Sequence, residues 1–123
     1  MTFDKATARV LIVEDDLELR TALGDLLALE GIAFVLARTG EEALAVLAAT
    51  PPTLILLDLQ MPQMDGPEFR KRQLANAEWA KIPVVVLSAD RAIASFSRSM
   101  QVADFLLKPI NVARLIGLIE RWA

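Results

Sequence analysis

The sequence LILLD at residues 54–58 decides the fold, because four aliphatic residues run directly into a carboxylate. An apolar run this short, placed between Pro51-Pro52 and a loop that ends at Gly66, is typical of a strand buried on both faces. Such strands belong to parallel sheets covered by helices, in which ligands bind beyond the carboxyl ends of the strands. Asp58 lies at that end, so we treat it as a candidate site residue, although an Asp in this place can also simply form a turn.

Four other segments resemble strands, and a segment with helical periodicity follows each strand. The predicted strands are residues 10–13, 33–37, 54–58, 83–87 and 105–107. The first predicted helix stops at Gly31 and has one apolar face, formed by Leu19, Ala22, Leu23, Leu26 and Leu27. Strands that alternate with helices through short links indicate a doubly wound α/β fold with a parallel sheet. The alternation alone does not determine the order of the strands.

The later helices are predicted from their first residues and their apolar side chains. Thr39 and Glu42 fit a capping box, in which the Glu42 side chain bonds back to the start of the helix. The other predicted starts are Gly66-Pro67 for the third helix, Asp90 for the fourth and Asn111 for the last. Side chains expected to pack inward, or to share one face of the last helix, are Leu74, Trp79, Val112, Leu115, Ile116, Ile119 and Trp122. The basic run at residues 70–72 is interpreted as a solvated helix face.

Length and composition indicate one globular domain without thiol or imidazole chemistry. Hydrophobic residues make up 54% of the 123 residues, so we expect a single domain over residues 1–123, with no output domain. The absence of Cys excludes disulfides and thiolate catalysis, and the absence of His removes the commonest general base and metal ligand. Any metal would therefore have oxygen ligands, which favours Mg²⁺, Mn²⁺ or Ca²⁺.

Charge and hydropathy argue against two kinds of partner. A net charge of −3 is a poor match for a nucleic-acid binder. No signal sequence follows Met1, and no apolar stretch approaches the ~18 residues of a membrane span. We therefore expect a soluble, cytoplasmic protein that binds neither nucleic acid nor membrane directly.

Polar residues of complementary chemistry follow four of the predicted strands. They are Glu14, Asp15 and Asp16 after the first strand, Asp58 after the third, Ser88 after the fourth and Lys108 after the fifth. These side chains are expected to meet at one edge of the sheet, where the carboxylates would repel one another unless a cation were bound. Mg²⁺ binds one or two carboxylates together with waters and phosphate oxygens. A carboxylate, Mg²⁺, a Lys and a hydroxyl are the groups required for phosphoryl transfer onto an Asp.

Four motifs resemble the signatures of the receiver domain of two-component response regulators. They occur in the family's order and at near-standard spacing: VEDD at residues 13–16, LDLQMPQMDG at 57–66, LSAD at 87–90 and FLLKP at 105–109. The resemblance covers the whole chain and implies the flavodoxin-like strand order 2-1-3-4-5. It also implies that the protein is not an enzyme with a separate substrate. Instead, it would accept a phosphoryl group from a histidine kinase or a phosphotransfer protein.

The same resemblance assigns roles to individual residues of this sequence. Asp58 resembles the phosphoacceptor, Lys108 its ion-pair partner and Ser88 the switch hydroxyl. Phe105 occupies the position of the switch aromatic residue, and Lys108–Pro109 resembles a peptide that is cis in the family. The implied Mg²⁺ or Mn²⁺ ligands are Glu14 (through water), Asp15, Asp58 and the backbone carbonyl of Gln60. Phosphorylation would switch the face formed by the fourth helix, the fifth strand and the last helix, in a monomer or a weak, phosphorylation-dependent dimer.

Three residues depart from the commonest pattern of the family. Phe105 replaces a frequent Tyr, so the ring lacks a hydroxyl. Val102 stands where Gly often precedes Ala-Asp. Asp16 is a third acid after the first strand, and we expect it to cap the first helix rather than bind metal.

Two alternative functions use a similar set of residues. A phosphatase or phosphomutase with an Asp nucleophile requires a second Asp two residues further on as its general acid, and here that position is Gln60. A receiver-like binding module that is not phosphorylated usually lacks the acceptor Asp, the acidic pair or the Lys. This sequence retains all of these residues.

Overall fold

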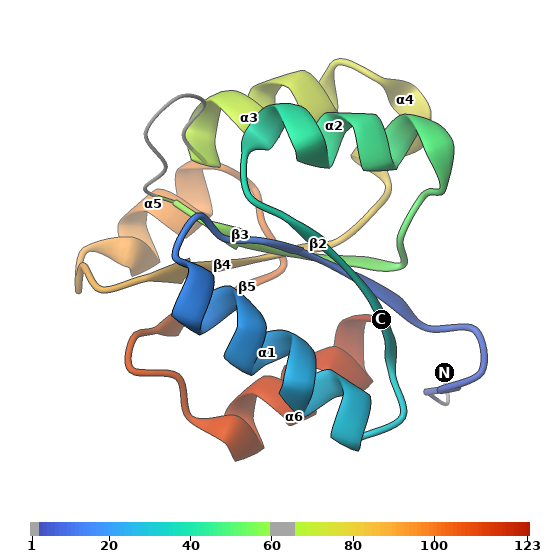
Figure 1. Cartoon of the computed structure of the whole chain (residues 1–123). Coiled ribbons are helices and arrows are strands. Elements are labelled where there is room, and N and C mark those ends of the chain that lie inside the picture. Colours follow the sequence, from blue (N-terminus) through green and yellow to red (C-terminus); the bar gives the residue numbers. More distant parts are fainter. Residues whose placement is uncertain (1–2, 60–65) are drawn as a thin grey trace.

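The computed structural model describes residues 3–59 and 66–123. In these residues, five parallel strands form one sheet in the order β2-β1-β3-β4-β5 between two layers of helices (Figure 1), which confirms the doubly wound fold and the predicted order. The strands are β1 (Arg9–Val13), β2 (Ala33–Ala37), β3 (Leu54–Asp58), β4 (Val84–Ser88) and β5 (Asp104–Leu107). The helices are α1 (Leu17–Leu29), α2 (Gly40–Ala49), α3 (Gly66–Leu74), α4 (Ala77–Ala80), α5 (Ile93–Ser99) and α6 (Val112–Trp122). Among the described residues, no helix is both long and apolar enough to span a bilayer.

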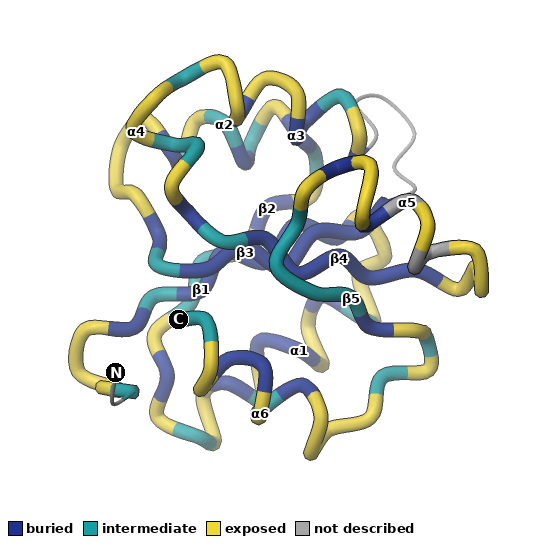
Figure 2. Tube along the Cα trace, turned by 180° about the vertical axis from the view of Figure 1, so that it is seen from behind, coloured by how far each residue is buried: buried dark blue, intermediate teal, exposed yellow. Residues whose placement is uncertain are grey.

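The sheet divides the core into two layers. Helices α1 and α6 cover one face, and α2, α3 and α4 cover the other (Figure 1). Side chains alternate across a strand, so Leu54 and Leu56 pack with the first group of helices, and Ile55 and Leu57 pack with the second. Strands β3 and β4 are buried along their whole length (Figure 2). The carboxyl ends of these strands therefore lie where the two layers meet.

Side-chain caps start three helices at the predicted residues. Asp16 is the N-cap of α1, and its carboxylate accepts a hydrogen bond from a backbone N–H of the first turn at 3.2 Å. Thr39 and Asn111 cap α2 and α6 with the same kind of bond. An oxygen at this position satisfies one of the N–H groups that a helix leaves unpaired at its start. The predicted capping role of Asp16 is confirmed.

Two of the predicted caps differ in detail from the expectation. The Glu42 carboxylate accepts the backbone N–H of Arg38 at 2.8 Å, one residue before the cap, because it also pairs with the Arg38 guanidinium at 2.9 Å. Asp90 accepts the N–H of Ala92 at 2.9 Å, and α5 begins only at the residue after that. Asp90 therefore forms a turn that leads into the helix.

Three side chains predicted to belong to apolar faces are exposed instead. Leu74 is 41% exposed because the neighbouring Gln73 takes the inward position and donates to the carbonyls of residues 79 and 82. Val112 is 52% exposed as the first residue of α6, one turn before the buried part of that helix. Ala22 lies on the outer side of α1. The remaining predicted side chains of these faces are buried or half-buried.

The basic run at residues 70–72 is only partly a solvated face. Arg72 is exposed and pairs with Glu68 one turn earlier. Arg70, in contrast, is 6% exposed, and its guanidinium donates to the backbone carbonyls of Met100 and Gln101 just beyond α5. The prediction was wrong for Arg70, because its partners lie about thirty residues further along the chain.

Candidate functional site

The register of the sheet brings the predicted site residues to one edge. Strands β1 and β3 end side by side, so Glu14 and Asp15 follow β1 next to Asp58, the last residue of β3. Ser88 ends β4 on the other side of Asp58, and Lys108 directly follows β5. Gln60, whose carbonyl was the fourth predicted metal ligand, lies outside the described residues.

Three carboxylates form a cluster at this edge. Oxygen atoms of Glu14, Asp15 and Asp58 all lie within 4.8 Å of one another. Glu14 and Asp58 are 1% and 3% exposed, whereas Asp15 is open to solvent. Burial, together with the negative charge of Asp58, raises the pKa of Glu14 to about 7. The cluster therefore binds a proton more readily than an isolated glutamate does.

Lys108 is the cation that faces the cluster. Its Nζ lies 3.4 Å from Oε2 of Glu14 and 3.5 Å from Oδ1 of Asp58, between the two buried carboxylates. The attraction of Lys108 lowers the pKa of Glu14 and so opposes part of the effect of burial and Asp58. Three acidic side chains face this one ammonium group, so acids outnumber the cation at this edge of the sheet.

The donors at this edge fit a hard divalent cation. All three acidic side chains offer oxygen, which Mg²⁺ and Mn²⁺ prefer over nitrogen or sulfur. Among the described residues, Oε2 of Glu14 is a buried atom without a hydrogen-bond partner, although Lys108 lies near it. Asp15 is accessible from solvent and could provide a direct ligand. The residues present therefore fit Mg²⁺ or Mn²⁺.

Ser88 and Phe105 lie on neighbouring strands. The Ser88 side chain is buried, and its Oγ accepts the N–H of Asp90 at 3.0 Å. The register pairs Phe105 with Val86, two residues before Ser88, and both Phe105 and Val86 pack in the α2–α3 layer. Alternate residues of a strand share one face, so the Ser88 side chain is on the same face as the half-buried Phe105 ring.

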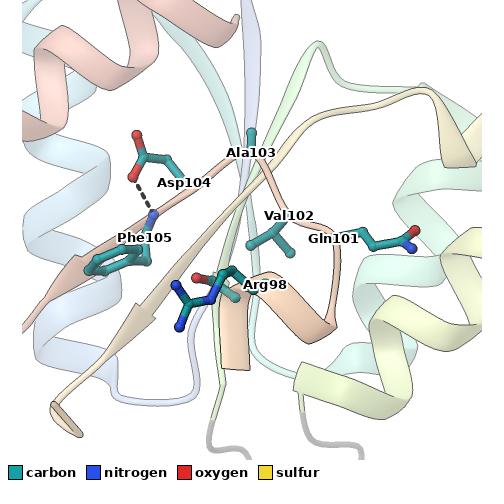
Figure 3. Close-up of a pocket in the computed structure, with 7 residues that line it drawn as sticks. Arg98, Gln101, Val102, Ala103, Asp104 and Phe105 are labelled. Atoms are coloured by element: carbon teal, nitrogen blue, oxygen red, sulfur yellow. Dashed lines mark hydrogen bonds between the residues drawn. The ribbon is translucent and has the colours of Figure 1, made fainter. Parts of the chain in front are cut away.

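A groove of about 320 Å³ lies beside the Phe105 ring (Figure 3). The end of α5 and the first residues of β5 line it, namely Ser97, Arg98, Gln101, Val102, Ala103, Asp104 and Phe105. The Asp104 carboxylate accepts the N–H of Phe105 at 2.8 Å and lies 3.4 Å from the Arg114 guanidinium of α6. Helix α5 and strand β5 therefore meet at this groove, and Asp104 links its lining to α6 through Arg114.

Two backbone features bear on the expectations from the sequence. The Lys108–Pro109 peptide is cis, in agreement with the resemblance. The residue after α5 with a left-handed backbone is Gln101, at φ 57°. The left-handed position, which favours glycine, is therefore Gln101, one residue before Val102.

Two residues near the site were not among the predicted site residues. Gly66 donates its N–H to the carbonyl of Leu59 at 3.0 Å, and a Cβ at this position would lie only 2.7 Å from the Cα of Leu59. Arg20 is 8% exposed and donates to the carbonyls of Glu14 and Asp15. Its helical spacing from the apolar residues 23 and 27 was a signal that it faces inward.

The fold and this edge of the sheet define a class of protein. A five-stranded parallel sheet in the order 2-1-3-4-5, with three carboxylates and a Lys at its carboxyl edge, is the arrangement of an α/β signalling receiver. The chain belongs to the response regulator receiver domain family, whose model matches residues 10–120. It is thus a receiver domain of the two-component type.

Known relatives agree with this assignment. The response regulator protein FleR of Pseudomonas aeruginosa is 38% identical over 94% of this chain, and the sensor histidine kinase TmoS of Ectopseudomonas mendocina is 36% identical over 96%. The chain spans only 24% and 13% of the lengths of these two proteins. The receiver domain of Ssk1, solved in complex with the Saccharomyces cerevisiae histidine phosphotransfer protein Ypd1, superposes with a TM-score of 0.87 at 28% identity. That alignment covers 99% of this chain and 91% of the other.

Proposed function

We propose that the chain is a phosphoacceptor module, in which Asp58 takes a phosphoryl group with the help of Mg²⁺ or Mn²⁺. The observation that carries this proposal is the position of Asp58, which lies at the carboxyl end of the central strand within reach of Glu14, Asp15 and Lys108. When bound, the cation would neutralise charge on the cluster and on the incoming phosphoryl group. Asp15, Glu14 and Asp58 would hold it, and the backbone carbonyl of Gln60 is proposed as a fourth ligand.

The chain's own residues would carry out the transfer. An oxygen of the Asp58 carboxylate attacks the phosphorus atom, and the bond from phosphorus to its former carrier breaks, so the carrier leaves with that electron pair. Lys108, 3.5 Å from Asp58, would attract the phosphoryl oxygens as the negative charge arrives. The low exposure of Asp58 limits the water that could hydrolyse the acyl phosphate formed.

The test of this proposal is covalent labelling. With Mg²⁺ and acetyl phosphate, intact mass should increase by one phosphoryl group, and the label should be lost in base. Asp58→Asn should abolish the label, while Asp25→Asn, which removes an exposed carboxylate of α1 outside the cluster, should keep it. Equal labelling of the Asp58→Asn variant would show that the acceptor is another residue.

A protein phosphodonor is proposed to dock at an apolar groove beside the site. The groove of about 490 Å³ lies between α1 and the segment after Lys108; its apolar lining comprises Leu19, Ala22, Leu23, Leu26, Leu29, Ile110 and Val112. The complex of the Ssk1 receiver domain with Ypd1 supports a histidine kinase or phosphotransfer protein as the donor. This partnership would take place in the cytoplasm, with no separate substrate to be turned over.

Docking and chemistry can be separated by one substitution. Ala22 is exposed and lines the groove, so Ala22→Arg would fill part of the groove while leaving the acidic cluster unchanged. We expect transfer from a protein phosphodonor to slow by about tenfold or more, with labelling by acetyl phosphate unchanged. Slowing of both reactions to the same degree would contradict docking at this groove.

The phosphorylated state is proposed to switch the face formed by α5, β5 and α6. Ser88 Oγ now accepts the N–H of Asp90, and a phosphoryl group on Asp58 would offer the hydroxyl an anionic acceptor. The turn of Ser88 would let the half-buried Phe105 ring move inward and reshape the groove in Figure 3. Such coupling is typically worth ~1–3 kcal/mol, or about 5–150-fold in partner affinity.

Ser88→Ala tests this switch. The variant should still be labelled on Asp58, but beryllofluoride, a phosphate mimic, should cause smaller NMR shifts at Phe105 and along residues 97–105 than in the wild type. Thr at position 88 keeps the hydroxyl, so Ser88→Thr is the matched control and should retain the wild-type pattern. Full wild-type shifts in the Ser88→Ala variant would exclude the hydroxyl from the switch.

A further inference from the structure

Arg20 bonds to the main chain of the acidic cluster, and no ion pair with the cluster's carboxylates is found among the described residues. It belongs to the first turn of α1 and is 8% exposed. Its Nη1 donates to the backbone carbonyl of Glu14 at 3.0 Å and to that of Asp15 at 3.2 Å. Among the described residues, no ion pair of Arg20 with an acid is found within 4.0 Å. The guanidinium therefore contacts the main chain of two cluster residues and leaves their carboxylates available.

The segment that carries these acids is also held at its other end. The backbone N–H of Arg20 bonds to the carbonyl of Asp16 at 2.9 Å, as the first intrahelical bond of α1. The N–H of Asp16 in turn donates to Oε1 of Glu14 at 3.3 Å. Residues 14–16 are thus tied to α1 through one backbone bond and through the Arg20 side chain.

The bonds from Arg20 counteract repulsion among the three carboxylates of the cluster. Oxygens of Glu14, Asp15 and Asp58 lie within 4.8 Å of one another, and without a cation the carboxylates would move apart if the backbone allowed it. The bonds from Arg20 oppose that movement, because each carbonyl is fixed to the rigid helix. The oxygens would then already be close together when a cation arrives, and less ordering would accompany binding.

We propose that Arg20 is a positioning residue that keeps Glu14 and Asp15 in the arrangement required for the divalent cation. This proposal rests on the metal site of the proposed function and extends it to a residue that touches neither metal nor phosphoryl group. Partners that orient metal ligands typically contribute about 10–100-fold to metal affinity.

The sign of the effect separates positioning from simple electrostatics. A positive guanidinium near a cation site repels the cation, so loss of its charge alone should tighten binding. If Arg20 positions the ligands, its loss should weaken binding in spite of the removed repulsion. A general loss of stability would weaken binding to the same degree when another buried arginine is removed.

Arg70 provides the matched control for this comparison. Like Arg20, it is buried and donates to two consecutive backbone carbonyls, but those belong to Met100 and Gln101 at the end of α5. Arg20→Met and Arg70→Met therefore remove the same chemical group from two different places. Arg20→Lys keeps the charge on a shorter side chain.

The experiment measures Mn²⁺ affinity by the EPR signal of the free ion, at a temperature where circular dichroism shows each variant folded, with Mg²⁺ affinity from competition. Arg20→Met should bind Mn²⁺ about tenfold more weakly than the wild type, Arg70→Met within about twofold of it, and Arg20→Lys at an intermediate level. If Arg20→Met does not fold, Arg20→Lys decides, and weaker binding supports positioning.

Three outcomes would overturn the inference: unchanged or tighter binding by Arg20→Met, equal weakening by both Met variants, or wild-type affinity of Arg20→Lys. Failure of the wild type to bind Mn²⁺ would refute the proposed metal site, and with it the role of Arg20. The two failures are distinguishable: if only the role of Arg20 is wrong, the wild type still binds Mn²⁺, and if the metal site is wrong, it does not.

Discussion

Two regions with buried polar side chains differ in how far those side chains find partners within the protein. At the junction of α3 and α5, Arg70 donates to the carbonyls of Met100 and Gln101, and Gln73 accepts from Arg70. At the acidic edge, Glu14 and Asp58 are buried beside each other with like charges. The junction is complete without a ligand, whereas the acidic edge retains an excess of negative charge.

The comparison shows how a small domain separates stability from function. Buried polar groups whose hydrogen bonds are satisfied within the protein stabilise one arrangement of the chain. Buried acids that lack enough positive partners instead favour the binding of a cation. At the junction, α5 ends in a left-handed residue, with the N–H of Gln101 bonded to the carbonyl of Arg98 and the N–H of Val102 to that of Ser97. This is a Schellman motif, and Arg70 binds the carbonyl of its left-handed residue.

The largest effect on stability is expected at the junction. Arg70→Met would remove three hydrogen bonds from a charged donor and leave two carbonyls without that partner, so the free energy of unfolding should fall by about 3–4 kcal/mol. Urea denaturation measures this loss. Arg72→Met is the control; Arg72 is exposed and forms one surface ion pair with Glu68, so the loss should be at most about 1 kcal/mol. Equal losses would mean that the junction does not hold α5 in place.

At the acidic edge, stability should depend on pH through Glu14. The pKa of Glu14 is raised to about 7 in the folded protein from 4.5, so the folded state binds the proton more tightly than the unfolded chain. The resulting stabilisation is complete below pH 4.5 and is lost as pH rises through 7, about 3 kcal/mol in all. Glu14→Gln, which cannot titrate, should lose this part of the pH dependence and be the more stable protein at pH 8.

Denaturation of the metal-free proteins at pH 5, 6, 7 and 8, in the presence of EDTA, provides the measurement. The difference between wild type and Glu14→Gln should change in favour of the variant as the pH rises. A constant difference across this range would mean that Glu14 does not bind a proton preferentially in the folded state. The acidic edge would then differ less from the junction than its geometry indicates.

The smallest expected effect lies within the Schellman motif. Gln101 has a φ of 57°, which costs a residue other than glycine about 1 kcal/mol. Gln101→Gly should therefore raise the free energy of unfolding by about 0.5–1 kcal/mol, after allowance for the greater freedom of glycine in the unfolded chain. Gly31, at φ 71°, is the reverse control, and Gly31→Ala should lower stability by a similar amount. A Gln101→Gly variant that is no more stable would mean that the left-handed backbone of residue 101 carries no measurable strain, since the bond from Arg70 to its carbonyl is kept in both proteins.

The elements of the fold could be predicted because their signals are local. Uninterrupted apolar runs marked β1, β3 and β4, and capping residues such as Asp16 and Thr39 marked helix starts within one turn. The acidic edge followed from the strand ends, since parallel strands bring those ends together. The strand order came from the family resemblance, because periodicity within one strand does not identify its neighbours.

The residues that escaped prediction are those whose partners are distant or lie on the main chain. The burial of Arg70 depends on carbonyls about thirty residues away, and that of Gln73 depends on the carbonyls of Trp79 and Ile82, beyond the end of α3. Leu74, the last residue of α3, is 41% exposed, while the inward place beside it is taken by Gln73. Arg20 shares the apolar face of α1, but no pattern of residue types indicates that backbone carbonyls are available there as hydrogen-bond acceptors.

The division of the core by the sheet has a consequence for how this sequence can change over time. Leu47 on α2 and Leu118 on α6 belong to different hydrophobic clusters, with the strands between them. Substitutions in the two layers should combine nearly additively, because the described residues of the two layers form separate hydrophobic clusters. The side chains of each layer can therefore change independently of the other layer, and the helices of that layer can acquire surfaces for new partners. Asp58 ends the central strand, against which both layers pack, so substitutions in either layer that move this strand are restricted.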